Sequence, residues 1–184
     1  MNLEGARIVC NLLGVENEKF YHAISTFKGA ARRLELLAKN ETVSVFKDFA
    51  HSPSKLKATT EAVHQQFPDR KIIACMELHT FSSLNENFLD LYKGSMDKAD
   101  IAIVYFNPQT IEHKKLNPIS ETQVKDAFGN PELKIFTDSK KMMHYLLEMN
   151  HRNSVVLMMS SGTFDGINLD ELAHQIVQKT LTEV

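Results

Sequence analysis

The sequence has little of what marks several large classes of protein. Only two of its 184 residues are cysteines, Cys10 and Cys75, and both lie in apolar runs far apart. This is typical of buried free thiols in a reducing compartment. No apolar stretch approaches the roughly 20 residues of a membrane-spanning helix, and the opening MNLEGARIV lacks a signal-peptide pattern. We therefore expect a cytoplasmic protein with no membrane partner.

An excess of positive charge is also absent. The 21 Lys and Arg residues are scattered along the chain, and the formal net charge is -2. A surface that binds nucleic acid would cluster its basic residues, so nucleic acid is not an expected partner. With 43% hydrophobic and 24% charged residues, the composition is that of an ordinary globular protein.

Common site motifs are missing too. The sequence contains neither a GxxxxGK[ST] phosphate loop nor a GxGxxG fingerprint. If a nucleoside triphosphate is bound, its phosphates must be held elsewhere. No HxH or HxxxH pair occurs either, and His51 and His79 could meet only if adjacent strands brought them together, so we expect no metal site.

What the sequence does contain is an alternation of short apolar runs with amphipathic stretches. The apolar runs are mostly continuous, as in strands that are covered on both faces. The strands predicted in this way are 42–50, 71–78, 100–106, 133–138 and 154–161. The helices predicted between them are 54–67, 86–98, 121–128, 139–149 and 168–182. This order predicts an α/β fold with a doubly wound, mostly parallel, Rossmann-like sheet and helices on both faces.

The first forty residues have a different pattern. They predict two helices, the first ended by Gly14 and the second capped by Asn17, and then a hairpin around 39–41. Two helices ahead of a complete α/β unit indicate the tail of a preceding domain, so we divide the chain into 1–32 and 33–184. Residues 107–120 form the longest irregular stretch, and loops of that length are often functional.

In open α/β sheets, ligands bind at the carboxyl ends of the strands. The first such end, KDFAHSPS, carries Asp48, His51 and Ser52. Ser52 before Pro53 suits a helix N-cap, beyond which free N–H groups could bind an anion, and Asp48 could accept hydrogen bonds from a ribose diol. The plain alternative is that Ser52 and Pro53 only start a helix and that Asp48 is solvated. A hydrolytic triad is disfavoured because no glycines flank Ser52.

Two other strand ends carry polar side chains. After 71–78 come His79 and Thr80, where the histidine could bind a ligand carboxylate or donate within a polar loop. After the last strand come Ser160, Ser161 and a glycine-containing turn that would let a ligand approach the backbone. Arg32 and Arg33 lie near the predicted domain junction. Either both are solvated, or one of them reaches a nucleotide across a cleft between the domains.

These residues occur in a recognisable arrangement. The segment FKGAARRLELLAKNETVSVFKDFAHSPSKLKAT resembles the junction of the central and C-terminal domains of Mur ligases, with Gly-x-x-Arg-Arg-x-Glu followed by Asp-(Tyr/Phe)-Ala-His-x-Pro. The closing VVLMMSSGTFDGI resembles the Met-Ser-x-Gly-x-Phe-x-Gly-Ile segment of the murein peptide ligase branch. The resemblance covers essentially the whole chain.

The resemblance implies an ATP-dependent amide ligase of peptidoglycan recycling. Such an enzyme phosphorylates the carboxylate of UDP-N-acetylmuramate, and the amine of L-Ala-γ-D-Glu-meso-diaminopimelate then attacks the acyl phosphate. ATP and Mg²⁺ would be held mainly by the central domain, whose phosphate loop this sequence lacks, so we expect no catalytic residue here and no activity from the chain alone. The central and N-terminal domains would be its partners within one polypeptide.

Residue by residue, the resemblance implies that Arg33 and Asp48 contact the adenosine. His51 and Ser52 would line the site of the amine substrate, where the helix start faces a carboxylate. The far wall of that site would be Ser160, Ser161 and Phe164.

One departure from the family concerns the second strand end. Alanine-adding relatives have His-Arg-Tyr there and peptide-recycling relatives have Glu-Pro-Arg, whereas this chain has ELHTFSS with no arginine. A carboxylate held by that arginine would here be held by His79, by Thr80 or by nothing. The muramate–L-alanine ligase therefore stays open as an alternative, and a non-enzymatic nucleotide- or sugar-binding α/β module is the alternative of another class.

Overall fold

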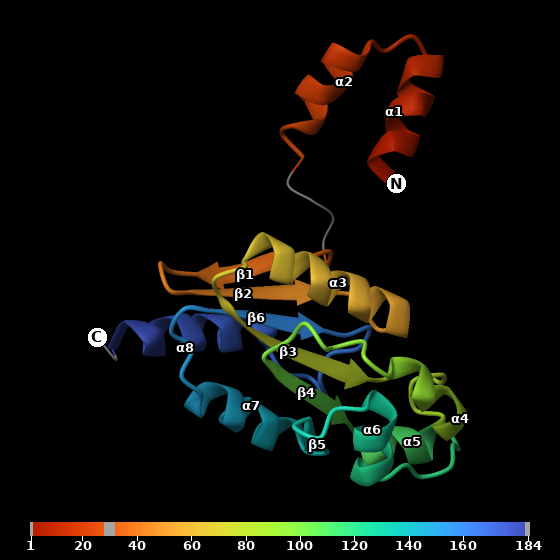
Figure 1. Ribbon diagram of the computed structural model, residues 1–184, viewed down its shortest axis with the longest axis vertical. Helices are drawn as coiled ribbons and strands as arrows, with labels where there is room; N and C mark the ends of the chain where they lie inside the picture. The colour runs from red at the N-terminus through yellow and green to blue at the C-terminus, as the bar shows by residue number, and fades with distance from the viewer. Residues whose placement is uncertain (1, 28–31, 183–184) are drawn as a thin grey trace. The chain divides into compact units, whose positions relative to one another are not determined.

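The computed structural model describes residues 2–27 and 32–182, which form two compact units, Met1–Ala31 and Arg32–Val184. The first unit contains helices α1 (Asn2–Leu12) and α2 (Asn17–Ile24) (Figure 1). As predicted, a glycine follows the first helix, with Gly14 in the left-handed region at φ 85°. The prediction for Asn17 was wrong by one position: Glu16 is the N-cap of α2. The Asn17 side chain instead accepts a hydrogen bond from Arg7 at 2.9 Å.

The second unit is built on a six-stranded sheet in the order β1-β2-β6-β3-β4-β5 (Figure 1). The strands are β1 (Glu35–Lys39), β2 (Val43–Asp48), β3 (Lys71–Leu78), β4 (Ile101–Phe106), β5 (Lys134–Phe136) and β6 (Ser154–Met159). The predicted hairpin is confirmed, since β1 pairs antiparallel with β2. The other neighbours pair in parallel.

Helices cover both faces of this sheet, which confirms the doubly wound α/β prediction. They are α3 (Pro53–Gln66), α4 (Glu86–Leu89), the 3₁₀ turn η1 (Asp90–Tyr92), α5 (Pro108–His113), α6 (Glu121–Phe128), α7 (Ser139–Glu148) and α8 (Leu169–Thr182).

Alternate strand residues supply the two cores. In β3, Ile72 and Ala74 belong to the cluster that includes α3 and α6 residues, whereas Ile73 and Cys75 belong to the cluster that includes α7 and α8 residues. This follows from the two-residue period of a strand, which sends successive side chains to opposite faces. Burial of Cys75 raises the pKa of its thiol, as expected of a structural cysteine.

Two predicted stretches differ from the structure. The helix expected over 86–98 is only α4 and η1, because the chain turns at Gly94, which has φ 70°. Within the stretch expected to be irregular, 107–120, lies the short helix α5. Asn107 caps it by accepting the N–H of Gln109, and Pro108 occupies the first turn. Among residues 2–27 and 32–182, no helix is long and apolar enough to cross a membrane.

Candidate functional site at the carboxyl edge of the sheet

The connection that follows β6 leads to a different face of the sheet from the connections that follow its neighbours β2 and β3. After β2 and β3 it runs to helices α3 and α4, whose residues pack in one core, whereas after β6 it runs to α8, whose residues pack in the other. Loops that diverge in this way open a crevice at the carboxyl ends of the strands, where ligands bind in open α/β folds. The polar residues that follow β2, β3 and β6 therefore meet at one edge.

Asp48, the last residue of β2, is 7% exposed and is therefore not solvated. One of its carboxylate oxygens accepts the N–H of Leu34 at 2.7 Å, and the other accepts the N–H of Ala50 at 2.7 Å. Leu34 has φ 45°, an uncommon conformation for a residue with a side chain. Asp48 thus ties the segment ahead of β1 to the end of β2, and this structural role was not predicted.

His51 is held on both its ring and its backbone. Its Nδ1 lies 2.8 Å from the carbonyl oxygen of Phe49, and Tyr92 donates its hydroxyl to the carbonyl of His51 at 2.6 Å. Because a carbonyl oxygen can only accept, Nδ1 carries the proton, and the Nε2 of a neutral ring is then an acceptor. Burial raises the pKa of Tyr92, which keeps this phenol protonated as a donor.

Ser52 is the N-cap of α3 and Pro53 begins the helix, as predicted. However, the Ser52 side chain makes no capping hydrogen bond. The expectation that this hydroxyl serves the cap was therefore wrong. Among the described residues no helix-capping role occupies it, so it can hydrogen-bond a ligand.

Glu77 joins the ends of β3 and β6. The residue is 3% exposed, and its Oε2 accepts both the hydroxyl of Ser160 and, at 2.9 Å, the N–H of Phe164. The other oxygen, Oε1, lies 3.4 Å from Nδ1 of His79. Ser160 also accepts the N–H of Gly162 at 2.6 Å. One buried carboxylate thus organises the loop after β6 and faces a predicted site histidine.

Gly162 fits between these groups because it lacks a side chain. A Cβ at this position would lie 2.8 Å from Glu77 Oε2 and 2.8 Å from Cγ of His79, well inside van der Waals contact. The turn after β6 therefore approaches the end of β3 at backbone distance. The glycine was expected to allow a ligand to approach, but it allows this contact within the protein.

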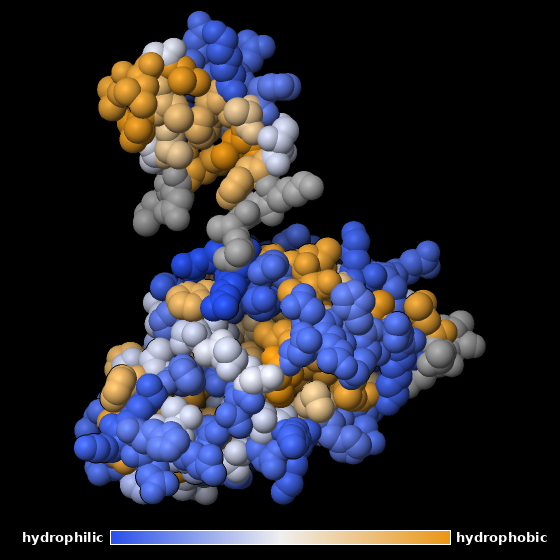
Figure 2. Space-filling model, turned by 180° about the vertical axis from the view of Figure 1, so that it is seen from behind, coloured by the Kyte–Doolittle hydropathy of each residue, from blue (hydrophilic) through white to orange (hydrophobic). Residues whose placement is uncertain are grey.

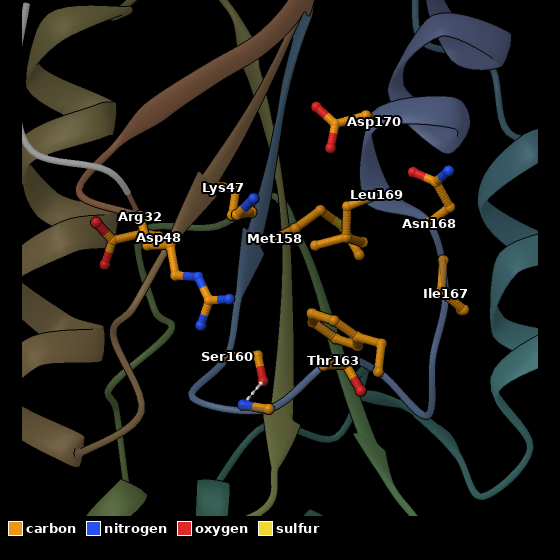
Figure 3. Close-up of a pocket in the computed structure, with 12 residues that line it drawn as sticks. Arg32, Lys47, Asp48, Met158, Ser160, Thr163, Ile167, Asn168, Leu169 and Asp170 are labelled. Carbon is orange, nitrogen blue, oxygen red and sulfur yellow. Dashed lines mark hydrogen bonds between the residues drawn. The ribbon is translucent and has the colours of Figure 1, made fainter.

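A pocket of about 190 Å³ lies beside this network (Figure 3). Its lining includes Asp48 from β2 and Ser160, Thr163 and Phe164 from the loop after β6. The Arg32 side chain extends into it (Figure 3). Ser160 donates its backbone N–H to the carbonyl of Asp48 at 3.0 Å, so two predicted site residues lie side by side.

The pocket lining carries as many positively charged residues as negatively charged ones. Arg32 and Lys47 supply the cations, and Asp48 and Asp170 supply the anions. Lys47 lies 3.8 Å from Glu35. Such a lining suits a polar ligand more than a bare polyanion.

Within the described ranges, no group of three or more His, Cys, Asp or Glu residues is arranged to hold a metal ion.

The other predicted site residues lie as follows. Arg33 is exposed, and its guanidinium lies 5.5 Å from the centre of the Phe49 ring, as in a cation–π contact. The hydroxyl of Thr80 bonds to those of Ser82 and Ser83 in a local turn. Ser161 is half-buried, and Phe164 lines the pocket but is 0% exposed. Gly29, which begins the quoted Gly-x-x-Arg-Arg segment, lies outside the described residues.

Sequence reasoning chose Arg33 for the nucleotide, whereas Arg32 lines the pocket. No role was predicted for Glu77. A signal was present, because Glu77 is the one charged residue between Ile72 and Leu78 of an apolar strand. A charge in a buried strand must be paired or hydrogen-bonded.

Residues 32–162 match the protein family described as Mur ligase, glutamate ligase domain. The UDP-N-acetylmuramate–L-alanine ligase of Desulfitobacterium hafniense (strain Y51) is 27% identical over 164 residues, which cover 88% of this chain and 36% of that enzyme.

Two solved structures share the fold. A murein peptide ligase from Psychrobacter arcticus 273-4 has a TM-score of 0.61 at 21% identity and covers 94% of this chain and 35% of its own. The UDP-N-acetylmuramate–alanine ligase of Thermotoga maritima has a TM-score of 0.69 at 16% identity and covers 100% of this chain and 37% of its own. The chain thus spans little more than a third of the length of these proteins.

Proposed function

This chain belongs to the Mur ligase family, and we propose that it forms the C-terminal domain of an ATP-dependent amide ligase that acts on UDP-N-acetylmuramate. In the proposed reaction the muramoyl carboxylate becomes an acyl phosphate, which the amine of L-Ala-γ-D-Glu-meso-diaminopimelate attacks. The product would be a peptidoglycan precursor made from a recycled peptide. The observation that best supports this proposal is that Asp48 and Ser160 line one pocket at the carboxyl edge of the sheet and are hydrogen-bonded to each other through their backbones.

The nucleoside contacts proposed for this domain are those of Asp48 and Arg33. Asp48 accepts two backbone N–H groups and, at 3.4 Å, the hydroxyl of Thr59, whereas a carboxylate has about four acceptor positions. The carboxylate can therefore still accept a hydrogen bond from a ribose hydroxyl. The neighbouring Arg32 extends into the pocket (Figure 3) and adds a second candidate cation for the nucleotide.

The amine substrate is proposed to bind where α3 begins and where β3 and β6 end. The free hydroxyl of Ser52 and the Nε2 of His51 offer hydrogen-bonding groups at the helix start. His79, Thr80, Ser160, Ser161 and Phe164 are the remaining residues assigned to this substrate site. We assign no catalytic residue and no metal ligand to the chain itself.

The unit Met1–Ala31 is proposed to be the end of the central, ATP-binding domain, with the C-terminal domain beginning near Arg33. It exposes large apolar side chains, among them Leu12 at the end of α1 at 82% and the following Leu13 at 78%, and Figure 2 shows hydrophobic residues gathered over this unit. Exposed apolar surface of this kind marks a protein interface. The rest of the central domain would cover it.

ATP and Mg²⁺ would be held mainly by that central domain, since this sequence has no phosphate loop. This chain's part would be to close over the nucleotide and present the amine. Closure of this kind gathers the reactants and excludes water from the acyl phosphate. Such a ligase would work in the cytoplasm, where nucleotide precursors are made.

A second candidate is the UDP-N-acetylmuramate–L-alanine ligase. It is favoured by the L-alanine ligase of Desulfitobacterium hafniense, at 27% identity over 88% of this chain, whereas the closing MSSGTFDGI segment favours the peptide ligase. Both candidates share the acyl phosphate chemistry and differ in the amine.

The proposal is tested by measuring ADP release from the complete polypeptide that contains this chain. We expect release that depends on both UDP-N-acetylmuramate and an added amine. ADP release that is indifferent to either substrate would contradict an amide ligase. The 184-residue chain alone should not hydrolyse ATP.

A further inference from the structure

Glu77 and His79 place a buried carboxylate close to one nitrogen of an imidazole ring. Glu77 Oε2 is already engaged by Ser160 and Phe164, which fixes the plane of the carboxylate. Oε1 lies 3.4 Å from the Nδ1 of His79, which is within ion-pair distance but without the alignment of a hydrogen bond. Because a buried carboxylate only accepts hydrogen bonds, a proton on Nδ1 is favoured and a lone pair there is repelled.

Gly162 confines the same edge of the ring. A Cβ on this glycine would lie 2.9 Å from Nδ1 of His79 and 2.8 Å from its Cγ. The ring edge that carries Nδ1 therefore faces the protein, while 41% of the side chain is exposed. In an imidazole ring Nε2 lies opposite the Cγ–Nδ1 bond, so it is on the side of the ring away from Gly162.

We propose that Glu77 is a positioning residue: when the His79 ring is neutral, the carboxylate favours the tautomer with its proton on Nδ1, so that Nε2 accepts an N–H from the amine substrate. This rests on the proposed function, and it narrows the role of His79 from a carboxylate contact to an amine contact. An imidazole in this state cannot replace an arginine, because it offers an acceptor where arginine offers donors. The ligand group at His79 is therefore a hydrogen-bond donor, which in the proposed substrate site is the primary amine.

The substitution Glu77→Gln tests the positioning role with almost no change in shape. The oxygen of the new amide is needed by Ser160 and Phe164, so its NH₂ group turns towards Nδ1 of His79. A donor at that place favours a lone pair on Nδ1 and moves the proton to Nε2. The variant should therefore reverse the tautomer.

The chain contains a matched control pair on its surface. His144 and Glu148 lie 3.3 Å apart, but the nitrogen involved is Nε2 and both side chains are well exposed, at 72% and 65%. Glu148→Gln should leave the His79 tautomer as it is. This variant therefore separates the effect of the buried carboxylate from that of a general change in charge.

The measurement is long-range ¹H–¹⁵N NMR of the histidine rings in the ¹⁵N-labelled chain at about pH 8, where an ordinary histidine is neutral. We expect His79 of the wild type and of Glu148→Gln to be protonated on Nδ1, and that of Glu77→Gln on Nε2. Protonation of wild-type His79 on Nε2 would overturn the positioning role without needing any variant to fold. So would a folded Glu77→Gln variant with an unchanged tautomer.

The ligand class is tested in the same samples. L-Alaninamide offers an amine without a carboxylate, and N-acetyl-L-alanine offers the reverse. We expect the first to shift the Nε2 resonance of His79 and the second to leave it unchanged. A response only to N-acetyl-L-alanine, or to neither compound, would overturn the amine assignment. Both results are independent of ligase activity, so they can fail while the proposed function holds.

Discussion

Asp48 Oδ2 accepts the backbone N–H of Leu34 at 2.7 Å, which ties the segment ahead of β1 to the end of β2. The bond holds Leu34 in a left-handed conformation, with φ 45°. Phe49 adds a second tie by donating its N–H to the carbonyl of Arg32 at 2.9 Å. The residue proposed to contact the nucleoside is therefore also the residue that fixes where the domain begins.

The substitution Asp48→Asn should lower the free energy of unfolding by about 1–3 kcal/mol. Both carboxylate oxygens accept a backbone N–H, and in either orientation of an amide one of these donors would face an NH₂ group. Urea unfolding of the chain measures the loss. Asp100→Asn is the control, since its single bond to the N–H of Ile72 can be kept by the amide oxygen. Equal losses in the two variants would contradict this account.

Replacing Ser52 by alanine should change the free energy of unfolding by no more than a few tenths of a kcal/mol, because its hydroxyl makes no cap bond. Ser120→Ala should cost about 1 kcal/mol, because Ser120 forms a full capping box with Gln123. In the complete enzyme, Ser52→Ala should raise the KM for the amine. A defect confined to ATP would contradict its assignment to the amine site.

A methyl group on Gly162 should displace the turn after β6. Gly162→Ala is expected to cost about 1–3 kcal/mol of stability, as overpacking does, and to shift the NMR signals of the His79 ring. Gly166→Ala is the comparison. Its Cβ would meet nothing within 4 Å, although φ is +83°, so it should destabilise by backbone strain and leave His79 unchanged. Unshifted His79 signals in Gly162→Ala would contradict the contact.

Stability should fall as the pH rises above about 10, the ordinary pKa of tyrosine. Burial raises the pKa of Tyr105 to about 12, so between these two values the unfolded chain has released the proton that the folded chain still holds. Burial raises the pKa of Tyr92 and Cys75 as well. Urea unfolding at a series of alkaline pH values measures the slope. Tyr105→Phe should make the slope less steep, because Tyr92 and Cys75 still contribute, and Tyr145→Phe should leave it as it is. An unchanged slope in Tyr105→Phe would refute the assignment.

Much of the fold could be predicted because its signals are local. The continuous apolar run of β3 and the capping residues of α6 each determine their own element, and both were placed correctly. Asn107 and Pro108 carried a helix-start signal for α5 that was not used. The helix expected over 86–98 failed because its apolar spacing continues past Gly94, whose backbone conformation ends it.

The site was predicted in outline only. Asp48 and Ser160 could be placed at the same edge because parallel strands end there. Their partners could not, since the bond from Glu77 to Phe164 spans 87 residues and depends on β6 lying beside β3. The sequence alone does not determine that strand order. For the same reason, the choice between Arg32 and Arg33 needed the pocket geometry.

The most direct test of the central claim is a comparison of amine substrates by the complete enzyme that contains this chain. With ATP, Mg²⁺ and UDP-N-acetylmuramate supplied, kcat/KM would be measured for L-Ala-γ-D-Glu-meso-diaminopimelate and for L-alanine. We predict ligation with a clear preference for the tripeptide. A preference for L-alanine would assign the chain to the alanine ligase, and the absence of ligation with either amine would contradict the account.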